Sequence, residues 1–112
     1  MKLDFNTVIS ERPAEGGCIH ECDELAIGWR TFAAGEKFAA HYHEHFEEVF
    51  ICVTGSLVVV IDDVDHELAP GDRLVVERRH IHSLSNRSSK PSEICYLKVP
   101  FVADDTVWVE TV

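Results

Sequence analysis

The chain has 112 residues, enough for one domain with a sizeable core and too few for two. Hydrophobic residues make up 46% and charged residues 27%, which is ordinary for a soluble globular protein. The formal net charge of −10 argues against nucleic acid or an anionic membrane surface as a partner, because both need a basic patch.

Short runs rich in Val, Ile, Phe and Leu recur between turn residues, which is the pattern of an antiparallel β domain. In chain order, the predicted strands cover residues 24–32, 37–43, 48–53, 56–61, 64–68, 73–76, 82–86 and 93–99. Glycine, proline and aspartate mark turns between them, as at Gly55 and Pro70-Gly71. We expect the less regular first twenty or so residues and the tail from Pro100 to pack on this framework, lie over its mouth or join a dimer interface.

Strands at this spacing predict an all-β fold, a single-domain jelly-roll β-barrel. The whole chain, residues 1–112, is expected to form one domain, with its core over about 24–99 and the two terminal segments packed on it. No internal repeat, low-complexity segment or linker interrupts the chain.

The cysteines and the N-terminus predict a reduced location. The sequence MKLDFNTVIS has no apolar leader core, and no apolar run approaches the length of a membrane span. Cys52 and Cys95 lie in apolar runs, where a free cysteine behaves as a small hydrophobe. Cys18-x-His20-x-Cys22 lacks the paired spacing of zinc motifs. We therefore expect a cytoplasmic protein without disulfides.

The segment HYHEHFEE, residues 41–48, has the composition of a metal site. In a strand over residues 37–43, His41 and His43 point to the same face with Cα atoms about 7 Å apart, which suits two imidazoles converging on one ion. Either Glu47 or Glu48 can lie near such an ion after the turn that follows, and strand alternation favours Glu48 only modestly. His45 falls at that turn.

Two further interpretations follow from strand alternation. Phe50 and Cys52 share a face with Glu48 and are predicted to line the pocket near the metal. In ERRHIHSLSN, His82 leads directly into a strand and is the better candidate for an additional ligand than His80, which sits in a charged turn. His45 and His80 are expected outside the ligand set, as neighbours of the ligands or proton shuttles.

One motif combines these residues. Gly35 is followed after five residues by His41, after one more by His43, after four by Glu48 and after six by Gly55. This spacing resembles the first motif of the cupins, which are small β-barrels. In that resemblance the six-residue gap before the final glycine selects Glu48 over Glu47.

A second stretch resembles the second cupin motif. Gly71, His82 and Asn86 stand at the spacing of its glycine, histidine and asparagine. The chain departs from the motif at Glu77, where the family prefers proline, and at Arg79, where it prefers glycine. These departures concern the turn before His82 and leave the ligand position in register.

The resemblance implies that His41, His43, Glu48 and His82 bind one divalent transition metal ion. Three imidazoles and one carboxylate suit Fe, Mn, Ni, Cu or Zn. An octahedral ion would keep two open positions, enough for a bidentate substrate or for substrate and dioxygen.

The expected function is a metal-dependent enzyme acting on a small oxygenated organic molecule, first of all a dioxygenase-type oxidoreductase. The alternatives are an isomerase, decarboxylase or lyase on the same scaffold, or a non-catalytic small-molecule-binding cupin. The expected partners are a small-molecule substrate or ligand and, as in many small cupins, a second copy in a homodimer.

Overall fold

The computed structural model describes residues 12–13 and 16–109. This part of the chain contains ten strands: β1 (Gly17–Glu21), β2 (Ala26–Phe32), β3 (Lys37–His43), β4 (Glu47–Thr54), β5 (Leu57–Ile61), β6 (Val64–Leu68), β7 (Arg73–Val76), β8 (His82–Ser85), β9 (Ser92–Val99) and β10 (Thr106–Trp108). No helix long and apolar enough to cross a membrane occurs among the described residues. The cytoplasmic location stays a prediction.

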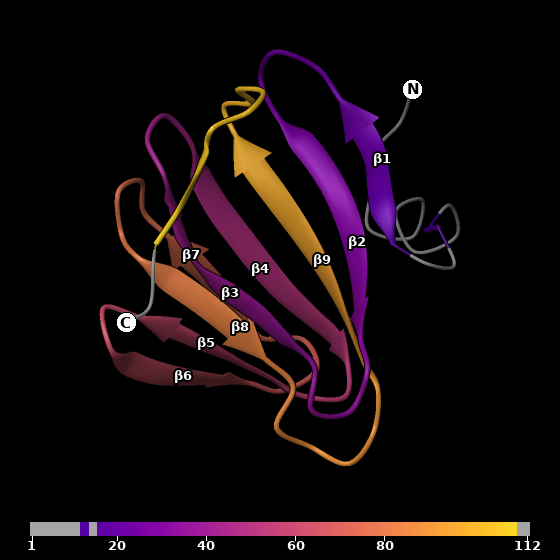
Figure 1. Ribbon diagram of the computed structural model, residues 1–112. Coiled ribbons are helices and arrows are strands. Elements are labelled where there is room, and N and C mark those ends of the chain that lie inside the picture. Colours follow the sequence, from indigo (N-terminus) through magenta and orange to yellow (C-terminus); the bar gives the residue numbers. More distant parts are fainter. Residues whose placement is uncertain (1–11, 14–15, 110–112) are drawn as a thin grey trace.

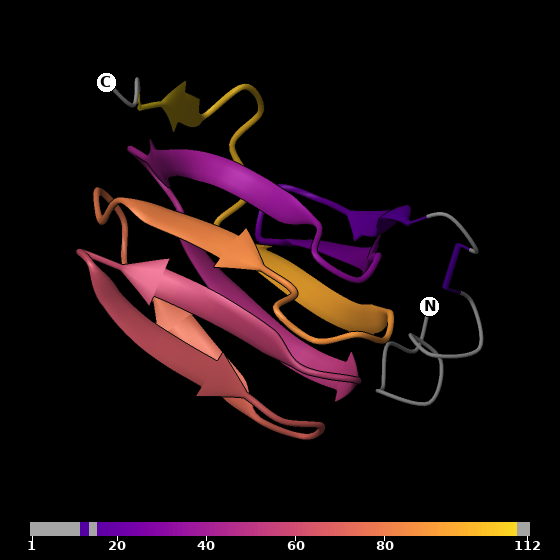
Figure 2. The same cartoon turned by 60° about the horizontal axis from the view of Figure 1, so that its bottom comes forward.

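The strands form two antiparallel sheets that face each other (Figures 1 and 2). One sheet has the order β1-β2-β9-β4-β7 and the other the order β10-β3-β8-β5-β6. From β2 onward, every connection between consecutive strands crosses from one sheet to the other except the one between β5 and β6. This arrangement confirms the predicted jelly roll, with one refinement: the two sheets are not closed into a barrel by hydrogen bonds within the described residues.

The eight predicted strands correspond to β2 through β9, with ends that agree to within two residues. The strands β1 and β10 were not predicted. The first is the mixed sequence GCIHE, and the second has only three residues, so neither carries an apolar alternation long enough to stand out. β10 places part of the C-terminal tail against β3, where Thr106 pairs with His43 and Trp108 with His41.

The main hydrophobic core lies between the two sheets. Phe32, Phe50, Val59 and Leu84 are among its buried members, which come from both layers. A second, smaller cluster around Trp29, Ile27 and Cys95 lies on the opposite face of the β2-β9-β4 layer. The alternation of side chains along β2 and β9 therefore divides them between the inner core and the outer cluster.

Three motif glycines stand where the backbone has a positive φ. Gly35, Gly55 and Gly71 have φ values of 78°, 75° and 93°. At Gly55 a side chain would also collide with the backbone of Pro91 and with Ser92, so glycine is required there for space as well as conformation. These glycines lie just before β3, β5 and β7 and so mark where these three strands begin.

Candidate metal centre

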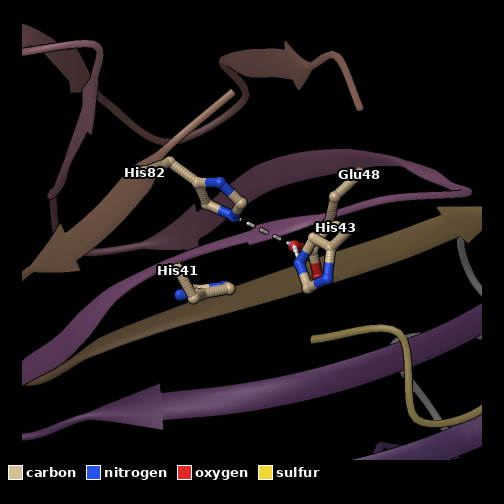
Figure 3. A group of neighbouring side chains, drawn as sticks. All are labelled: His41, His43, Glu48 and His82. Carbon is tan, nitrogen blue, oxygen red and sulfur yellow. Dashed lines mark hydrogen bonds and ion pairs between the residues drawn. The ribbon is translucent and has the colours of Figure 1, made fainter. Parts of the chain in front are cut away.

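Four buried side chains from three strands converge between the sheets. His41 and His43 come from β3, Glu48 from β4 and His82 from β8, and Figure 3 shows their polar groups lying together. One possible ligand atom from each lies within 4.8 Å of the others. All four residues are at most 6% exposed. Among the described residues this is the only group of three or more His, Cys, Asp or Glu side chains so arranged.

Strand pairing explains the convergence. His41 and His82 are direct cross-strand partners on β3 and β8, and their ring centroids lie 4.2 Å apart. His43 lies two residues further along β3 on the same face. Glu48 reaches the cluster from the opposite sheet, because the short turn after β3 carries the chain across to β4.

Hydrogen bonds to the backbone orient the three imidazoles. Nδ1 of His41 donates to the carbonyl of Ala39 at 2.8 Å, and Nδ1 of His82 donates to the carbonyl of His80 at 3.0 Å. Nδ1 of His43 donates to the carbonyl of Asp105 at 3.3 Å. Because a carbonyl can only accept, Nδ1 of each ring is the donor in these bonds, and a neutral ring that donates in this way has the lone pair of Nε2 available for a metal.

Two of the Nε2 atoms face the carboxylate of Glu48. Nε2 of His43 lies 3.1 Å from Oε1 of Glu48. Nε2 of His82 lies 3.4 Å from the same oxygen, too long for a good hydrogen bond, and this fully buried nitrogen has no other partner among the described residues. A cation between the nitrogens and the carboxylate would satisfy all of these lone pairs.

The pKa values of the cluster suit metal ligands, which must be deprotonated. Burial is the main reason that the pKa of His41 is lowered to about 4, and the neighbouring His82 and His43 act in the same direction. Burial raises the pKa of Glu48, but hydrogen bonds and charge from His43 and His82 outweigh it and lower the value to about 2. His41 is therefore neutral and Glu48 ionised at neutral pH.

The donor set fits a divalent transition ion. Neutral imidazole nitrogens and one carboxylate are ligands for Fe, Mn, Ni, Cu and Zn, whereas Mg²⁺ and Ca²⁺ prefer oxygen. The fold thus brings together all four residues expected from the sequence, and of the two adjacent glutamates only Glu48 belongs to the cluster. Glu47 faces the other way and lies near the exposed Arg78, with 3.9 Å between charged atoms.

The cluster forms part of the wall of a cavity of about 130 Å³ between the sheets. The lining residues are Arg30, Phe32, Phe38, His41, His43, Glu48, Phe50, Leu84, Ile94, Tyr96, Lys98 and Thr106. Phe50 thus lines the cavity as expected. Cys52 lies further along β4, fully buried in the core, and is not among the lining residues.

A β-bulge in β3 shapes the cavity wall. The pairing of β3 with β8 shifts between Phe38 and His41, so that one extra residue is accommodated in β3. Strict alternation would place Phe38 and His41 on opposite faces, but after the bulge both line the cavity and their rings lie 5.0 Å apart. The sequence gives no signal for this irregularity, and the contribution of Phe38 was not predicted.

The other two histidines near the motif point away from the cluster. Nδ1 of His45 bonds Oδ1 of Asp105 at 2.7 Å, and the side chain is 68% exposed. Nδ1 of His80 bonds Oδ2 of Asp62 at 2.5 Å at the surface. Neither lines the cavity. Each is nevertheless linked to a residue near the cluster: the backbone carbonyl of His80 accepts from His82, and the side chain of His45 bonds Asp105.

Sequence analysis missed three polar residues of the cavity. Arg30, Lys98 and Thr106 come from β2, β9 and β10. A signal existed for Lys98, because Ile94, Tyr96 and Lys98 alternate along a predicted strand. This alternation does not by itself place Lys98 near the cluster, because that position depends on the pairing of β9 with β4, in which Lys98 stands opposite Glu48.

Comparisons with known proteins agree with this geometry. Residues 28–99 match the family model described as "Cupin domain". The chain belongs to the cupin family.

Individual relatives are more distant. The chain is 37% identical over 49 residues to quercetin 2,3-dioxygenase of Bacillus subtilis. This match covers 44% of this chain and 14% of that protein. It is 29% identical over 70 residues to the tetracenomycin polyketide synthase protein TcmJ of Streptomyces glaucescens, covering 62% of this chain and 47% of that protein. The chain thus spans less than half the length of these curated relatives.

Among solved structures, the chain is similar to an uncharacterized conserved protein with a double-stranded beta-helix domain from Klebsiella pneumoniae. The TM-score is 0.79 at 16% identity, and the match covers 99% of this chain and 100% of that chain. At this identity the likeness concerns the fold.

Proposed function

We propose that the protein is a metal-dependent enzyme acting on a small oxygenated organic molecule, first of all a dioxygenase-type oxidoreductase. The observation that carries the proposal is the set of three imidazoles and one carboxylate whose possible ligand atoms meet at the wall of a cavity. A bound divalent transition ion would supply Lewis acidity and, for a redox-active metal, electron transfer. The name of the Bacillus subtilis relative supports the dioxygenase form.

The chain's own residues suit this chemistry. Phe32, Phe38, Phe50, Leu84 and Ile94 give the cavity an apolar wall that keeps water from a bound molecule. Burial raises the pKa of Tyr96, so its hydroxyl stays protonated and can donate a hydrogen bond to a substrate oxygen.

The size of the cavity limits the substrate. A volume of about 130 Å³ is comparable to a cavity that holds a single benzene ring. We therefore expect a molecule with one ring or a few carbon atoms, considerably smaller than a flavonol.

A second candidate is an isomerase, decarboxylase or lyase. It is favoured by Tyr96 and Lys98, which follow each other on the inner face of β9 and can deliver a proton to, or neutralise, an enolate formed next to the cluster. A third candidate is a binding protein in which the metal only anchors a ligand.

Oxygen consumption and substrate loss separate these candidates. The protein would be loaded in turn with Fe(II), Mn(II), Ni(II), Cu(II) and Zn(II) and assayed with small catechols, β-diketones, hydroxy acids and oxo acids, in air and under nitrogen. A dioxygenase consumes oxygen in proportion to substrate, and Glu48→Gln abolishes the activity whereas Glu47→Gln does not. Equal substrate loss under nitrogen would establish the second candidate, and ligand binding without turnover the third.

The homodimer also remains a proposal. Light scattering on the purified protein tests it directly. A truncation after Pro100 is a poor probe, because it would remove Asp105 and Thr106, which contact the cluster and the cavity. The single substitution Val107→Glu on the exposed part of β10 is a better test of whether that strand contributes to a dimer interface.

A further inference from the structure

We propose that the cavity selects small organic acids and that Arg30 holds the substrate carboxylate, with Lys98 attracting the anion at the other end of the cavity. The inference rests on the proposed function only in taking this cavity as the substrate site. It adds the class of substrate, which the four candidate metal ligands do not by themselves indicate.

The charge of the cavity differs from that of the whole protein. The chain carries a formal net charge of −10. Of the described residues that line the cavity, Arg30 and Lys98 are cations, and Glu48, the sole acid, belongs to the ligand cluster. A divalent ion at the cluster would leave the cavity clearly positive. A cavity of this sign in an acidic protein favours anions and repels cations.

Arg30 is held in place by its neighbours. Its guanidinium lies 4.6 Å from the ring centroid of Phe32 and 4.7 Å from that of Phe38. One Nη atom bonds Glu36 at 3.1 Å, and Glu36 in turn accepts from the backbone of Ala33. These contacts fix the plane of the guanidinium before any ligand arrives, which lowers the entropy cost of binding.

One donor of Arg30 remains unused. Its Nε is buried and has no hydrogen-bond partner within the described part of the chain. An arginine that served only the ion pair with Glu36 would leave this buried N–H unsatisfied, which is costly. A carboxylate can accept from Nε and from an Nη at the same time, in the two-bond geometry that guanidinium groups favour. The unpaired Nε is therefore the donor that we assign to a bound carboxylate.

Lys98, unlike Arg30, has no acidic partner among the described residues. No described carboxylate lies within ion-pair distance of it, and its ammonium rests 5.5 Å from the ring centroid of Phe46 and 5.6 Å from that of Tyr96. It pairs across the strands with Glu48, so it enters the cavity next to the ligand cluster. A lysine in this place raises the local concentration of anions near the metal ligands.

The positions of the two cations limit the size of the acid. Arg30 pairs with Ile94 on β9, four residues before Lys98 on the same strand. The two cations thus enter from opposite ends of the inner face, with Tyr96 between them. The guanidinium lies 4.7 Å from the ring centroid of Phe38, and that centroid lies 5.0 Å from the centroid of the His41 ring, so the guanidinium and the His41 ring are less than about 10 Å apart. A short acid can therefore reach Arg30 with its carboxylate and the cluster with another oxygen.

The test compares acids with their neutral amides in protein loaded with Zn(II). Benzoate and benzamide, lactate and lactamide, and methyl phosphate would be titrated into ¹⁵N-labelled wild type, Arg30→Gln, Arg30→Lys and Lys98→Gln. The control is Arg87→Gln, which removes another arginine–carboxylate pair, with Asp65, outside the cavity. The ¹⁵N spectra also report whether each variant is folded.

We expect each acid to bind wild type at least about 10-fold more tightly than its amide, and Arg30→Gln to weaken acid binding about 10- to 100-fold. Arg30→Lys and Lys98→Gln should lose less, and Arg87→Gln nothing. Because carboxylates also bind Zn(II) directly, the loss in Arg30→Gln is the decisive comparison. Equal acid affinity in wild type and Arg30→Gln, equal affinity of acid and amide, or tighter binding of methyl phosphate than of either acid would overturn the proposal.

The proposed function can fail separately. If no metal supports turnover but acid binding still depends on Arg30, also in the metal-free protein, the enzyme proposal falls and the acid-binding site stands. If turnover occurs on neutral molecules with no dependence on Arg30, the reverse holds.

Discussion

The backbone carbonyl of Asp105 accepts the Nδ1 proton of His43, although 62 residues separate the two in the chain. The carboxylate of the same aspartate accepts hydrogen bonds from the backbone N–H of His45 at 2.8 Å and of Phe46 at 3.2 Å. Asp105 therefore connects the loop after β3 to the C-terminal tail through its carboxylate, and its carbonyl orients the imidazole of His43. Asp105 is 7% exposed, so water cannot readily replace these bonds.

The substitution Asp105→Ala keeps the backbone carbonyl that accepts from His43 but removes the carboxylate that ties the tail to the loop after β3. Metal binding is therefore expected to weaken by at most about 10-fold, less than the loss of an orienting group itself would cause. The substitution should also lower the free energy of unfolding by about 1–3 kcal/mol, because two backbone donors lose their acceptor. Competition with a chelator and urea denaturation measure the two effects. His45→Ala removes the exposed imidazole alone and serves as control. An Asp105→Ala protein with wild-type metal affinity would show that the carbonyl keeps its place beside His43 without the bonds made by the carboxylate.

Glu48→Gln should abolish stoichiometric binding of Zn(II) or Mn(II), whereas Glu47→Gln should leave it unchanged. The two glutamates are adjacent in sequence, but only Glu48 is buried against His43 and His82. Metal analysis after dialysis measures the difference. His41→Ala and His82→Ala should behave as Glu48→Gln does. Full metal content in all three variants would exclude this cluster as the site.

The stability of the metal-free protein should fall as the pH decreases from about 6.5 to 4. The folded-state pKa of His41 is lowered to about 4 from an ordinary 6.5, so in this interval the unfolded chain binds a proton that the folded chain does not. A difference of this size corresponds to a loss of about 3 kcal/mol over the interval. Glu48, with a pKa lowered to about 2 from 4.5, extends the loss to lower pH.

Urea denaturation with a chelator present, repeated between pH 4 and 7, measures this loss. His41→Gln should flatten the dependence, whereas His66→Gln, on β6 and away from the cluster, should not. The same slope in His41→Gln as in wild type would contradict the assignment to His41.

Arg79→Gly is expected to stabilise the protein by about 1 kcal/mol. Arg79 has a φ of 71°, and the N–H of His80 bonds the carbonyl of Glu77 at 3.3 Å across the turn. A positive φ at the third residue of a turn favours glycine and strains other residues. The exposed contact with Glu44 at 3.4 Å adds little in compensation.

Thermal or urea denaturation measures the gain at Arg79. Its neighbour Arg78 is not among the residues with positive φ, so Arg78→Gly should be neutral or destabilising. A loss of stability in Arg79→Gly equal to that in Arg78→Gly would show that the backbone there is not strained.

The exposed and the buried cysteines should differ in how fast their thiols react. Cys18 is exposed and should react with a disulfide reagent in the native protein. Cys52 and Cys95 are 0% and 2% exposed, and burial raises the pKa of both thiols, that of Cys95 to about 11. These two should react only after unfolding. Mass spectrometry of the labelled protein identifies the sites, with Cys18→Ser as control, and rapid native labelling of Cys95 would contradict the packing.

The strands and the ligand positions could be predicted because they depend on local patterns. Period-two alternation places His41 and His43 on one face, and the turn glycines Gly35, Gly55 and Gly71 mark the ends of strands through their backbone conformation alone. The same patterns could not reveal β10, because a three-residue strand has no periodicity. They also placed Cys52 beside the metal, whereas it lies deeper in the core.

By itself, the sequence determined a jelly-roll domain and, through its resemblance to the two cupin motifs, a four-residue donor set. Spacing within one strand fixed only that His41 and His43 share a face. Only the tertiary structure decided what surrounds that set. The pairing of β9 with β4 brings Lys98 beside Glu48, and the bulge in β3 turns Phe38 inward toward Arg30. These contacts join residues distant in the chain, and no local propensity specifies them. The acid preference that we propose for the cavity therefore depends on how the two sheets pack.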